Sequence, residues 1–529
     1  MKRASSFFQK HYFGIGLCFA LCVAFLLRVF KLSTLPNFIQ VDEATLGYNA
    51  WCLAHFGVDR FLNEMPIYPQ NYFGGQSPLC TYLVSLFILT IGRGKLTLFI
   101  VRLPSLIFNM LGIIFSIKTI HLIFKNKNLT LVCAFLSAIL PYLIMQARFG
   151  QDCNLMFGCC AIAMYSTFKY VNSQKRADLC LCGVSFGLVM YSYALSYIFV
   201  PLCLSLIALY MLYVKKINIP GIILWAVSLC ITVLPILLFI SSLLLKLDPF
   251  KFLFFNIYPV ASGRMSEISL QGYWAKVWGS MQLTLTYDML IVNSIPKYGT
   301  MYYISVPFIV VGLFVSLYHF VISLKKRQFH HSVLFLFYYI SGLLTMGFFD
   351  SNIYRANFFF AAYIYFIILG IHSVYCFLQT YRKPFAIVLT GGYLLLALSF
   401  VRFYFTAYKF VVDSYMHLNP YYFVPPVEAV DFTDNELCAE TVYIDTELSE
   451  VYLFFSPVSP YEWTETRPED NDGYGHYKFR VNSETPITTE NAYISRKENI
   501  EFISTLNSYD IPYETVEYGD YYYLFYFPE

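Results

Sequence analysis

Apolar stretches of about 20 residues recur along this chain, and they constrain its fold more than any other feature. A helix needs about 20 apolar residues to cross the hydrocarbon layer of a membrane. The stretches that separate the basic clusters predict eleven crossings, near residues 12–31, 97–123, 129–147, 153–170, 178–195, 197–214, 220–243, 301–323, 332–349, 356–377 and 385–404. We therefore expect a polytopic α-helical membrane protein.

Composition supports this expectation. The chain has 529 residues, of which 58% are hydrophobic and 13% charged, whereas soluble domains carry about 25% charged residues. The net charge of +3 gives no reason to expect a nucleic-acid partner. The 14 cysteines show no metal-ligand spacing, so we interpret them as small core residues. The N-terminal apolar run lacks a small-residue cleavage site and is interpreted as a retained first span.

Basic residues predict the orientation, because they favour the cytoplasmic side of a membrane. The inside clusters are Lys2/Arg3/Lys10, Lys125/Lys127, Lys175/Arg176, Lys215/Lys216, Lys325/Lys326/Arg327 and Arg382/Lys383. This assignment puts the N-terminus in the cytoplasm and the C-terminus outside the cell membrane. A shorter apolar stretch from Ser77 would break the parity of the crossings, so we expect a juxtamembrane or re-entrant helix there.

Acidic residues divide the chain into two predicted domains. Residues 1–404 hold only ten of the 33 acidic residues, and all but Asp178 fall on the predicted outer side. These residues form the predicted transmembrane domain, whose long outer loops cover 33–96 and 244–300. The other 23 acidic residues lie in 405–529, where short alternating runs and one helical pattern predict a small extracytoplasmic α/β domain.

Several outer residues have both a structural and a functional interpretation. Asp42 fits an N-cap of the helix that follows it, and Glu43 fits the positive end of that helix. Arg148 and Asp152 have the spacing of a simple i,i+4 pair. The remaining arginines at span ends fit side chains that reach the lipid headgroups: Arg102, Arg264 and Arg355.

Taken together, these residues favour a reaction on a lipid phosphate. A carboxylate can take the proton of an acceptor hydroxyl, and fixed cations can stabilise the charge that grows on a phosphate leaving group. The chain has no soluble nucleotide-binding domain, so a lipid-linked donor fits better than a nucleotide sugar. We expect a polyprenyl-phosphate sugar and membrane lipids as partners.

The sequence resembles the GT-C superfamily of membrane glycosyltransferases, and within it the family 39 type. That type includes protein O-mannosyltransferases, the aminoarabinose transferase of lipid A and uncharacterised bacterial members. The resemblance covers residues 1 to about 404, and Val41, Trp51 and Cys52 depart from the pattern. It is carried by Asp42-Glu43, "GYNA", "GVDR", "GGQSPLCTYLVSLF", "VRLPSLIFNMLG", "QARFGQDCNLM", "SGRMSEI" and "NIYRANFFFAAYIYF".

The resemblance implies an inverting transfer with Asp42 as general base, with Glu43 orienting either Asp42 or the acceptor, and with Asp152 as a second acid in the same cavity. If the reaction uses a divalent metal, Asp42 and Asp152 are its expected ligands. The residues expected to bind substrate are Tyr48, Arg102, Arg148, Arg264, Lys297, Tyr298 and Arg355.

Two other functions remain open at this point. A flippase or transporter for a lipid-linked sugar would use the same arginines but would need no base. A polymerase or ligase of lipid-linked glycans would also work at the outer face. The pattern does not specify the sugar or the acceptor.

Overall fold

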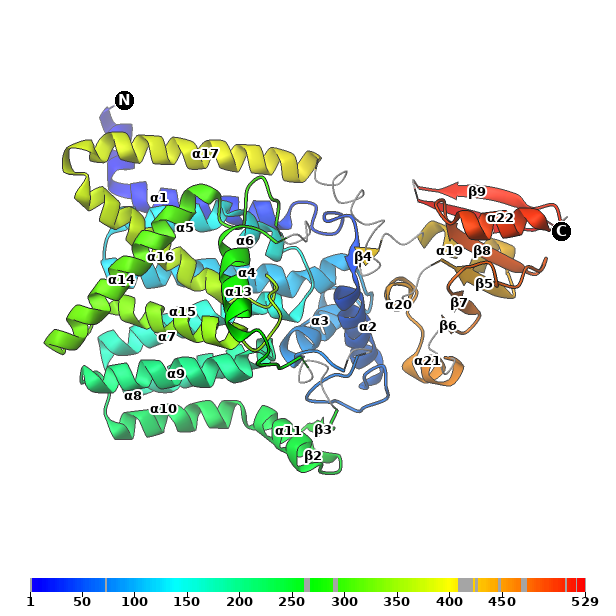
Figure 1. The fold of residues 1–529 in the computed structure, drawn as a ribbon, viewed down its shortest axis with the longest axis horizontal. Coiled ribbons are helices and arrows are strands. Elements are labelled where there is room, and N and C mark those ends of the chain that lie inside the picture. The colour runs from blue at the N-terminus through cyan, green and yellow to red at the C-terminus, as the bar shows by residue number, and fades with distance from the viewer. Residues whose placement is uncertain are drawn as a thin grey trace.

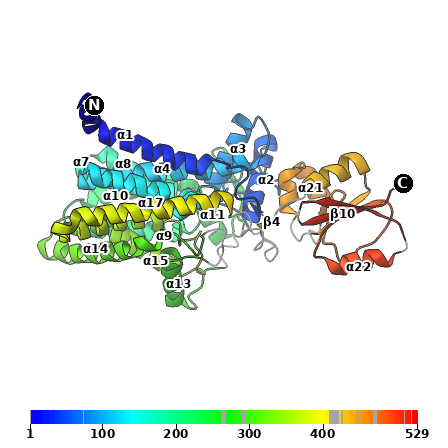
Figure 2. The ribbon, with the colours of Figure 1, turned by 90° about the horizontal axis from the view of Figure 1, so that it is seen from above.

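The computed structural model describes residues 2–71, 74–260, 267–288, 294–407, 422–423, 427–445, 449–467, 473–509, 511–519 and 521–528, with the backbone alone at 2–10 and 422–423. A bundle of long helices occupies one end of the molecule (Figure 1). Residues 427–528 form a separate body at the other end, here called the C-terminal domain. The first outer loop lies between them in both views (Figure 2).

Each predicted crossing has a helix or a broken pair of helices over it. Within the described residues, six helices are long and apolar enough to span a membrane, and a bent pair adds a seventh. The six are α1 (Lys2–Val29), α4 (Leu98–Phe124), α9 (Ser196–Tyr213), α14 (Val306–Lys326), α16 (Phe359–Phe377) and α17 (Arg382–Thr406). The bundle also contains α7 (Met156–Ser173), α8 (Arg176–Ser192) and α15 (His331–Met346), which are not among the six.

Two predicted crossings differ from the structure because proline interrupts them. The stretch 220–243 forms α10 (Ile219–Thr232) and α11 (Leu234–Leu245), which meet at an angle of 73°. The stretch 129–147 forms α5 (Lys127–Ile139) and α6 (Pro141–Gln146). Each second helix has a proline in its first turn. Proline disfavours helical geometry in the residue before it and lacks an N–H for the preceding helix.

The two outer loops contain short elements that cap one end of the bundle. The first has β1 (Ile39–Gln40), α2 (Val41–Phe56) and α3 (Pro78–Thr90). Helix α3 has 13 residues, so it is too short to span a membrane, as expected for the stretch from Ser77. The second loop contains β2 (Phe250–Phe252), β3 (Phe255–Ile257) and α13 (Tyr273–Leu285).

The C-terminal domain has the predicted α/β composition. Its six-stranded sheet has the order β6-β7-β5-β8-β10-β9, in which β5 runs parallel to β7 and β8. The elements are α19 (Val427–Phe432), β5 (Thr441–Ile444), α20 (Glu450–Phe455), α21 (Pro460–Thr466), β6 (Gly473–Tyr474), β7 (Tyr477–Phe479), β8 (Asn491–Arg496), α22 (Ile500–Ser508), β9 (Glu514–Tyr518) and β10 (Tyr522–Tyr526). Side chains alternate between the two faces of a strand, so α20 and α21 cover one face and α22 the other.

One hydrophobic core joins the first outer loop to the C-terminal domain. Ala44 and Leu46 of α2 belong to the same buried cluster as Leu453 and Phe454 of α20. The cluster continues into the sheet through Val442 and into the bundle through Val101. The two parts of the chain that the sequence predicted as separate domains therefore share buried apolar contacts.

The orientation can be tested with a natural thiol. Cys438 is exposed in the C-terminal domain, so a membrane-impermeant maleimide should label it in intact cells. In a Cys438→Ser background, Lys326→Cys, at the exposed end of α14, should be labelled only after permeabilisation. Protection of Cys438 in intact cells, with labelling after permeabilisation, would contradict the predicted orientation.

Candidate functional site

Asp42 lies in the first turn of α2, but it does not cap the helix. The N-cap is Gln40, whose side-chain oxygen accepts hydrogen bonds from the backbone N–H groups of Asp42 at 2.7 Å and Glu43 at 3.3 Å. The Gln40 amide also donates to the Asp42 carboxylate at 3.3 Å. The capping interpretation of Asp42 is therefore wrong. The half-buried Asp42 carboxylate is not required to start the helix.

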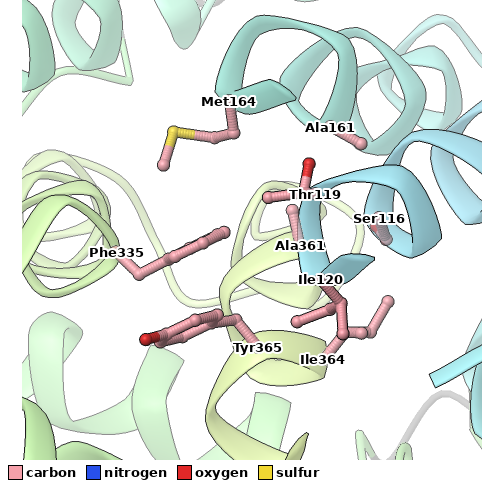
Figure 3. Close-up of a pocket in the computed structure, with 9 residues that line it drawn as sticks. All are labelled: Ser116, Thr119, Ile120, Ala161, Met164, Phe335, Ala361, Ile364 and Tyr365. Carbon is pink, nitrogen blue, oxygen red and sulfur yellow. The ribbon is translucent and has the colours of Figure 1, made fainter. Parts of the chain in front are cut away.

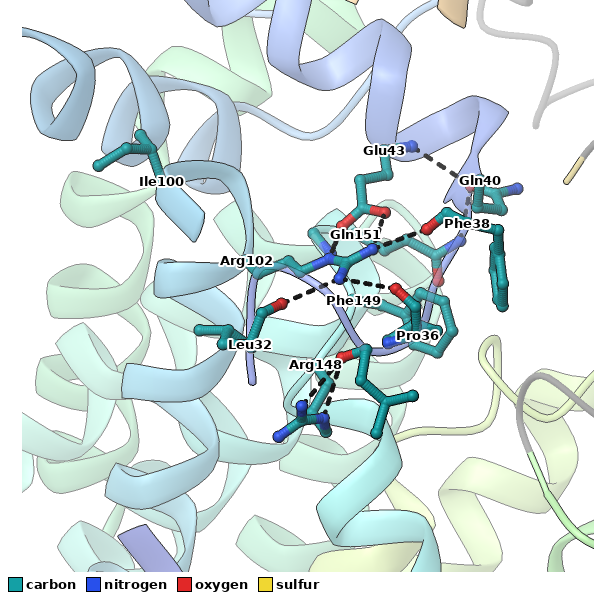
Figure 4. A network of polar contacts seen from close by, with 12 residues as sticks. Leu32, Pro36, Phe38, Gln40, Glu43, Ile100, Arg102, Arg148, Phe149 and Gln151 are labelled. Carbon is teal, nitrogen blue, oxygen red and sulfur yellow. Dashed lines mark hydrogen bonds and ion pairs between the residues drawn. The ribbon is translucent and has the colours of Figure 1, made fainter. Parts of the chain in front are cut away.

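Glu43 is completely buried and pairs with Arg102 of α4 (Figure 4). The guanidinium donates from Nε to one carboxylate oxygen at 2.9 Å and from a terminal nitrogen to the other at 3.2 Å. The Gly150 N–H donates to the same carboxylate at 2.8 Å. The other three donors of Arg102 bind the carbonyls of Leu32, Pro36 and Phe38. All five N–H donors of Arg102 are thus used within the protein.

Glycine at position 150 makes this arrangement possible. A Cβ atom there would lie 2.4 Å from the Val101 side chain and 2.8 Å from the Val101 carbonyl oxygen. A larger residue would therefore push its backbone away from α4 and withdraw its N–H from Glu43. The small residue in "RFGQD" allows the loop before Asp152 to contact the buried ion pair.

Arg148 is also buried, and it binds the end of α1 rather than Asp152. Its guanidinium donates to the carbonyls of Leu27, Arg28, Phe30, Lys31 and Leu35 at 2.7–3.2 Å. The last carbonyls of a helix lack partners within it and carry partial negative charge. A cation satisfies both needs, so Arg148 fixes where the first span ends. It retains no donor for an external phosphate.

Asp152 approaches Asp42 through the segment that precedes α3. One oxygen of its carboxylate accepts the Ser77 N–H at 3.0 Å. The neighbouring Gln76 side chain donates to the Asp42 carbonyl at 2.9 Å. The two acids that the sequence singled out are thus held by adjacent residues of one segment. Within the described residues, no group of three His, Cys, Asp or Glu side chains is arranged to hold a metal.

The loop between α15 and α16 completes this group. Arg355 forms an ion pair with Glu267 at 3.0 Å, while its buried Nε has no hydrogen-bond partner among the described residues. Burial and the nearby Asp42 carboxylate raise the pKa of Tyr354 to about 12, so its hydroxyl stays protonated at neutral pH. Asn357 donates to the Cys153 carbonyl at 2.9 Å, which ties this loop to the one that carries Asp152.

Three other predicted site residues lie apart from this group, and one cannot be placed. The Tyr298 hydroxyl contacts Ser399 of α17, and the exposed Lys297 lies over the Tyr298 ring. Tyr48 donates to the Val458 carbonyl in the C-terminal domain at 2.9 Å. Arg264 lies outside the described residues.

An internal cavity within the bundle does not extend this group. Its volume is about 10 Å³, at the lower limit for one water molecule. Figure 3 shows mainly apolar side chains around it. They come from four helices of the bundle, α4, α7, α15 and α16: Ser116, Thr119, Ile120, Ala161, Met164, Phe335, Ala361, Ile364 and Tyr365. A space of this size is a packing gap rather than a substrate site.

Comparison with known proteins identifies the fold. Residues 75–239 match the family model described as dolichyl-phosphate-mannose-protein mannosyltransferase. The chain is similar to ArnT from Cupriavidus metallidurans in its apo state, with a TM-score of 0.55 and 10% identity over 98% of this chain and 100% of that one. An Archaeoglobus fulgidus oligosaccharyltransferase, tethered with an acceptor peptide, gives a TM-score of 0.55 and 13% identity over 98% and 74%. This is the GT-C fold.

The GT-C fold confirms the resemblance found in the sequence. A second ArnT structure from the same organism, bound to undecaprenyl phosphate, has a TM-score of 0.54 and 10% identity over 98% of this chain and 99% of that one. In three other structures of the archaeal oligosaccharyltransferase, the match covers 56%, 53% and 64% of that longer chain. No curated protein matches the sequence. Identities this low show a shared fold, so the activity has to be argued from the site.

Four residues of this site within the GT-C fold were not singled out from the sequence: Gln40, Gln76, Tyr354 and Asn357. All four stand inside or beside the motifs quoted above, in "QVDEA", "GGQSP" and "NIYRAN". Only Tyr354 is adjacent to a charged residue, Arg355, so the available signal was that these polar residues stand within or beside the motifs. Their roles depend on which loops meet in space, and spacing along the chain does not reveal that.

Glu43 and Asp42 should respond differently to loss of their charge. Glu43→Gln leaves the Arg102 cation buried without its counter-charge, and breaking such a pair costs about 3–5 kcal/mol. We expect a large loss of thermal stability in detergent. Asp42→Asn, the matched control at the adjacent carboxylate, should unfold near the wild-type temperature because Gln40 supplies the cap. Equal stability of the two variants would contradict this assignment.

Proposed function

We propose that this protein transfers a sugar from a polyprenyl-phosphate donor to an acceptor hydroxyl at the outer face of the membrane. The observation that carries the proposal is the position of the half-buried Asp42 in the first turn of α2, a helix that lies at the end of the bundle (Figure 1). Gln76 binds the Asp42 backbone carbonyl and Ser77 binds Asp152, and the Asp42 carboxylate acts on Tyr354, the neighbour of Arg355. A lipid-linked donor keeps its chain among the spans and presents its phosphate at their ends. The bond to be broken then lies at the level of these loops.

In the proposed reaction, Asp42 accepts the proton of the acceptor hydroxyl while that oxygen attacks the anomeric carbon. The bond from this carbon to the phosphate oxygen breaks in the same displacement. The lipid phosphate leaves with the bonding electrons, the configuration is inverted, and no covalent sugar–enzyme intermediate forms. Glu43 orients Asp42 by fixing the first turn of α2 through Arg102. Asp152 holds the segment that lies against Asp42.

Asp42 and Asp152 also fit a role as metal ligands. Mg²⁺ is commonly bound by one or two carboxylates together with substrate phosphate oxygens. Gln76 binds the Asp42 backbone carbonyl and the adjacent Ser77 binds the Asp152 carboxylate. One short segment therefore holds both acidic residues, and their carboxylates would be the ligands of such an ion. A bound Mg²⁺ would neutralise charge on the departing phosphate.

Arg355 is the proposed phosphate ligand among the described cations of this site. Arg102 and Arg148 have no free donors, whereas the buried Nε of Arg355 has no partner among the described residues. The residue before it, Tyr354, is close enough to Asp42 for the Asp42 charge to raise the pKa of the Tyr354 hydroxyl. The lipid phosphate would replace or share the contact between Arg355 and Glu267. Lys297 and Arg264 remain proposals for a second contact.

The similar ArnT structure bound to undecaprenyl phosphate supports a polyprenyl-phosphate partner. The proposed location is the plasma membrane of a bacterial cell, with the N-terminus in the cytoplasm and the C-terminal domain outside. A flippase would need the phosphate site but no base. The role of Asp42 therefore separates the two functions.

Asp42→Asn tests the proposal directly. Asparagine keeps the size of the side chain but cannot take the proton, and loss of a general base typically lowers rates by ~10²–10⁴-fold. The purified variant should bind undecaprenyl phosphate as the wild type does. In membranes that contain the natural acceptors and are supplied with a panel of undecaprenyl-phosphate sugars, the wild type should release undecaprenyl phosphate and the variant almost none. Ordinary turnover by this variant would disprove the base assignment and favour transport.

Arg355→Ala tests the phosphate contact. A hydrogen bond to a charged group contributes about 1.5–3 kcal/mol, so affinity for undecaprenyl phosphate should fall by about 10- to 150-fold. Arg382→Ala is the matched control, because Arg382 is half-buried and donates to backbone carbonyls at the far end of α16. Unchanged affinity in the Arg355 variant would show that it only pairs with Glu267.

A further inference from the structure

The segment before the C-terminal domain pairs with the chain just before α2, and the domain itself packs against the first half of α2. Just before Asp42, the backbone of β1 pairs with β4 (Tyr422–Phe423), in an antiparallel register that places Gln40 opposite Tyr422 and Ile39 opposite Phe423. Gln40 is also the residue that caps α2 and contacts the Asp42 carboxylate. The segment that leads into the C-terminal domain therefore pairs directly with Gln40, the residue that contacts Asp42.

Just over one turn later, at Gly47, α2 has no side chain of its own toward α20, and the Phe454 ring of α20 packs on the helix backbone. A Cβ atom on Gly47 would lie 2.5 Å from a ring carbon of Phe454. Such distances are not tolerated, so only glycine lets the Phe454 ring lie directly on the helix backbone. Phe454 is buried in the core that includes Ala44 and Leu46. The spacing between α2 and the C-terminal domain is thus fixed by direct contact.

The third contact is polar and largely buried. The Tyr48 hydroxyl donates to the Val458 carbonyl at 2.9 Å. Arg60 lies 5.2 Å from the Tyr48 ring centre and 4.6 Å from that of Trp463, with its terminal nitrogen 3.6 Å from the Glu450 carboxylate. Both charges are withdrawn from solvent. A buried charge needs its partner, so this contact favours one docked position of the domain over sliding alternatives.

We propose that the C-terminal domain is a positioning component of the reaction site, which acts through α2 on the Asp42 carboxylate. Gly47, Tyr48 and Phe454 are positioning residues in this proposal and touch no substrate. A base must be held within about 0.5 Å of its productive geometry. The inference rests on the proposed function, because it takes Asp42 as the base. It assigns Tyr48 to the domain contact rather than to substrate binding.

The test is a size exchange across the α2–α20 contact. Gly47→Ala adds the Cβ that meets Phe454, so α2 and α20 must separate, and Phe454→Leu in the same chain removes the ring carbons that it meets. We expect Gly47→Ala to lower kcat by about 10- to 100-fold with little change in the donor KM. The double variant should recover most of that loss. Gly391→Ala is the matched control, because a Cβ there has no neighbour within 4 Å.

A milder variant covers the case in which Gly47→Ala folds poorly. Tyr48→Phe removes only the hydroxyl that binds the Val458 carbonyl, and it should lower kcat by about 2- to 10-fold. A merely structural role would reduce the yield of folded protein and leave kcat per folded molecule unchanged. Wild-type kcat in folded Gly47→Ala and Tyr48→Phe, or no recovery in the double variant, would overturn the proposal.

Hydrogen exchange separates this inference from the proposed function, because it requires no turnover. Backbone amides of residues 39–47 should exchange faster in Gly47→Ala than in the wild type, and Phe454→Leu should restore their protection. If the wild type transfers no sugar from any donor of the panel, the proposed function fails, and exchange alone decides whether the domain positions α2. Unchanged exchange at 39–47 would refute the contact's role in either case.

Discussion

The buried pair of Glu43 and Arg102 is the interaction on which the rest of the site depends. It joins the first turn of α2 to the long apolar helix α4. The same guanidinium donates hydrogen bonds to three carbonyls of the chain between α1 and α2. A charged pair withdrawn from water is stable only when its hydrogen-bonding groups are satisfied. Here that condition fixes the path of the loop, and with it the direction in which Asp42 points.

Two adjacent carboxylates therefore do different work. Glu43 has a structural role, because both of its carboxylate oxygens accept hydrogen bonds from Arg102 and one also accepts the Gly150 N–H. Asp42 is half-buried and is relieved of capping by Gln40. A carboxylate that the helix does not need for capping, but that its neighbours hold in place, fits the proposed role of general base. Because the two residues are adjacent, the ion pair of Glu43 also fixes the backbone that carries Asp42.

The sequence predicted the helical membrane fold well, because apolar length is a local property of each span. The breaks at Pro141 and Pro235 could also have been predicted, since proline acts on its own neighbours. The roles of Arg102 and Arg148 could not be. Both stand at span ends like residues that bind a phosphate, and only the three-dimensional path of residues 27–38 supplies the carbonyls that occupy them. The sequence also grouped Asp42 with Asp152, and this stays a prediction; the residues that link them, Gln76 and Ser77, depend on loop contacts.

The contact between Tyr48 and Val458 joins residues 410 positions apart. Contacts so distant in sequence form late, because closing a long loop costs entropy before the contact gains anything. During synthesis, the surface of α2 around Gly47 therefore stays uncovered until α20, which supplies Phe454, has been made. An incomplete chain would hold the proposed base on a loosely placed helix. In the proposed function, the reaction site is therefore complete only once α20 has docked on α2, and a partly made chain would lack a firmly placed base.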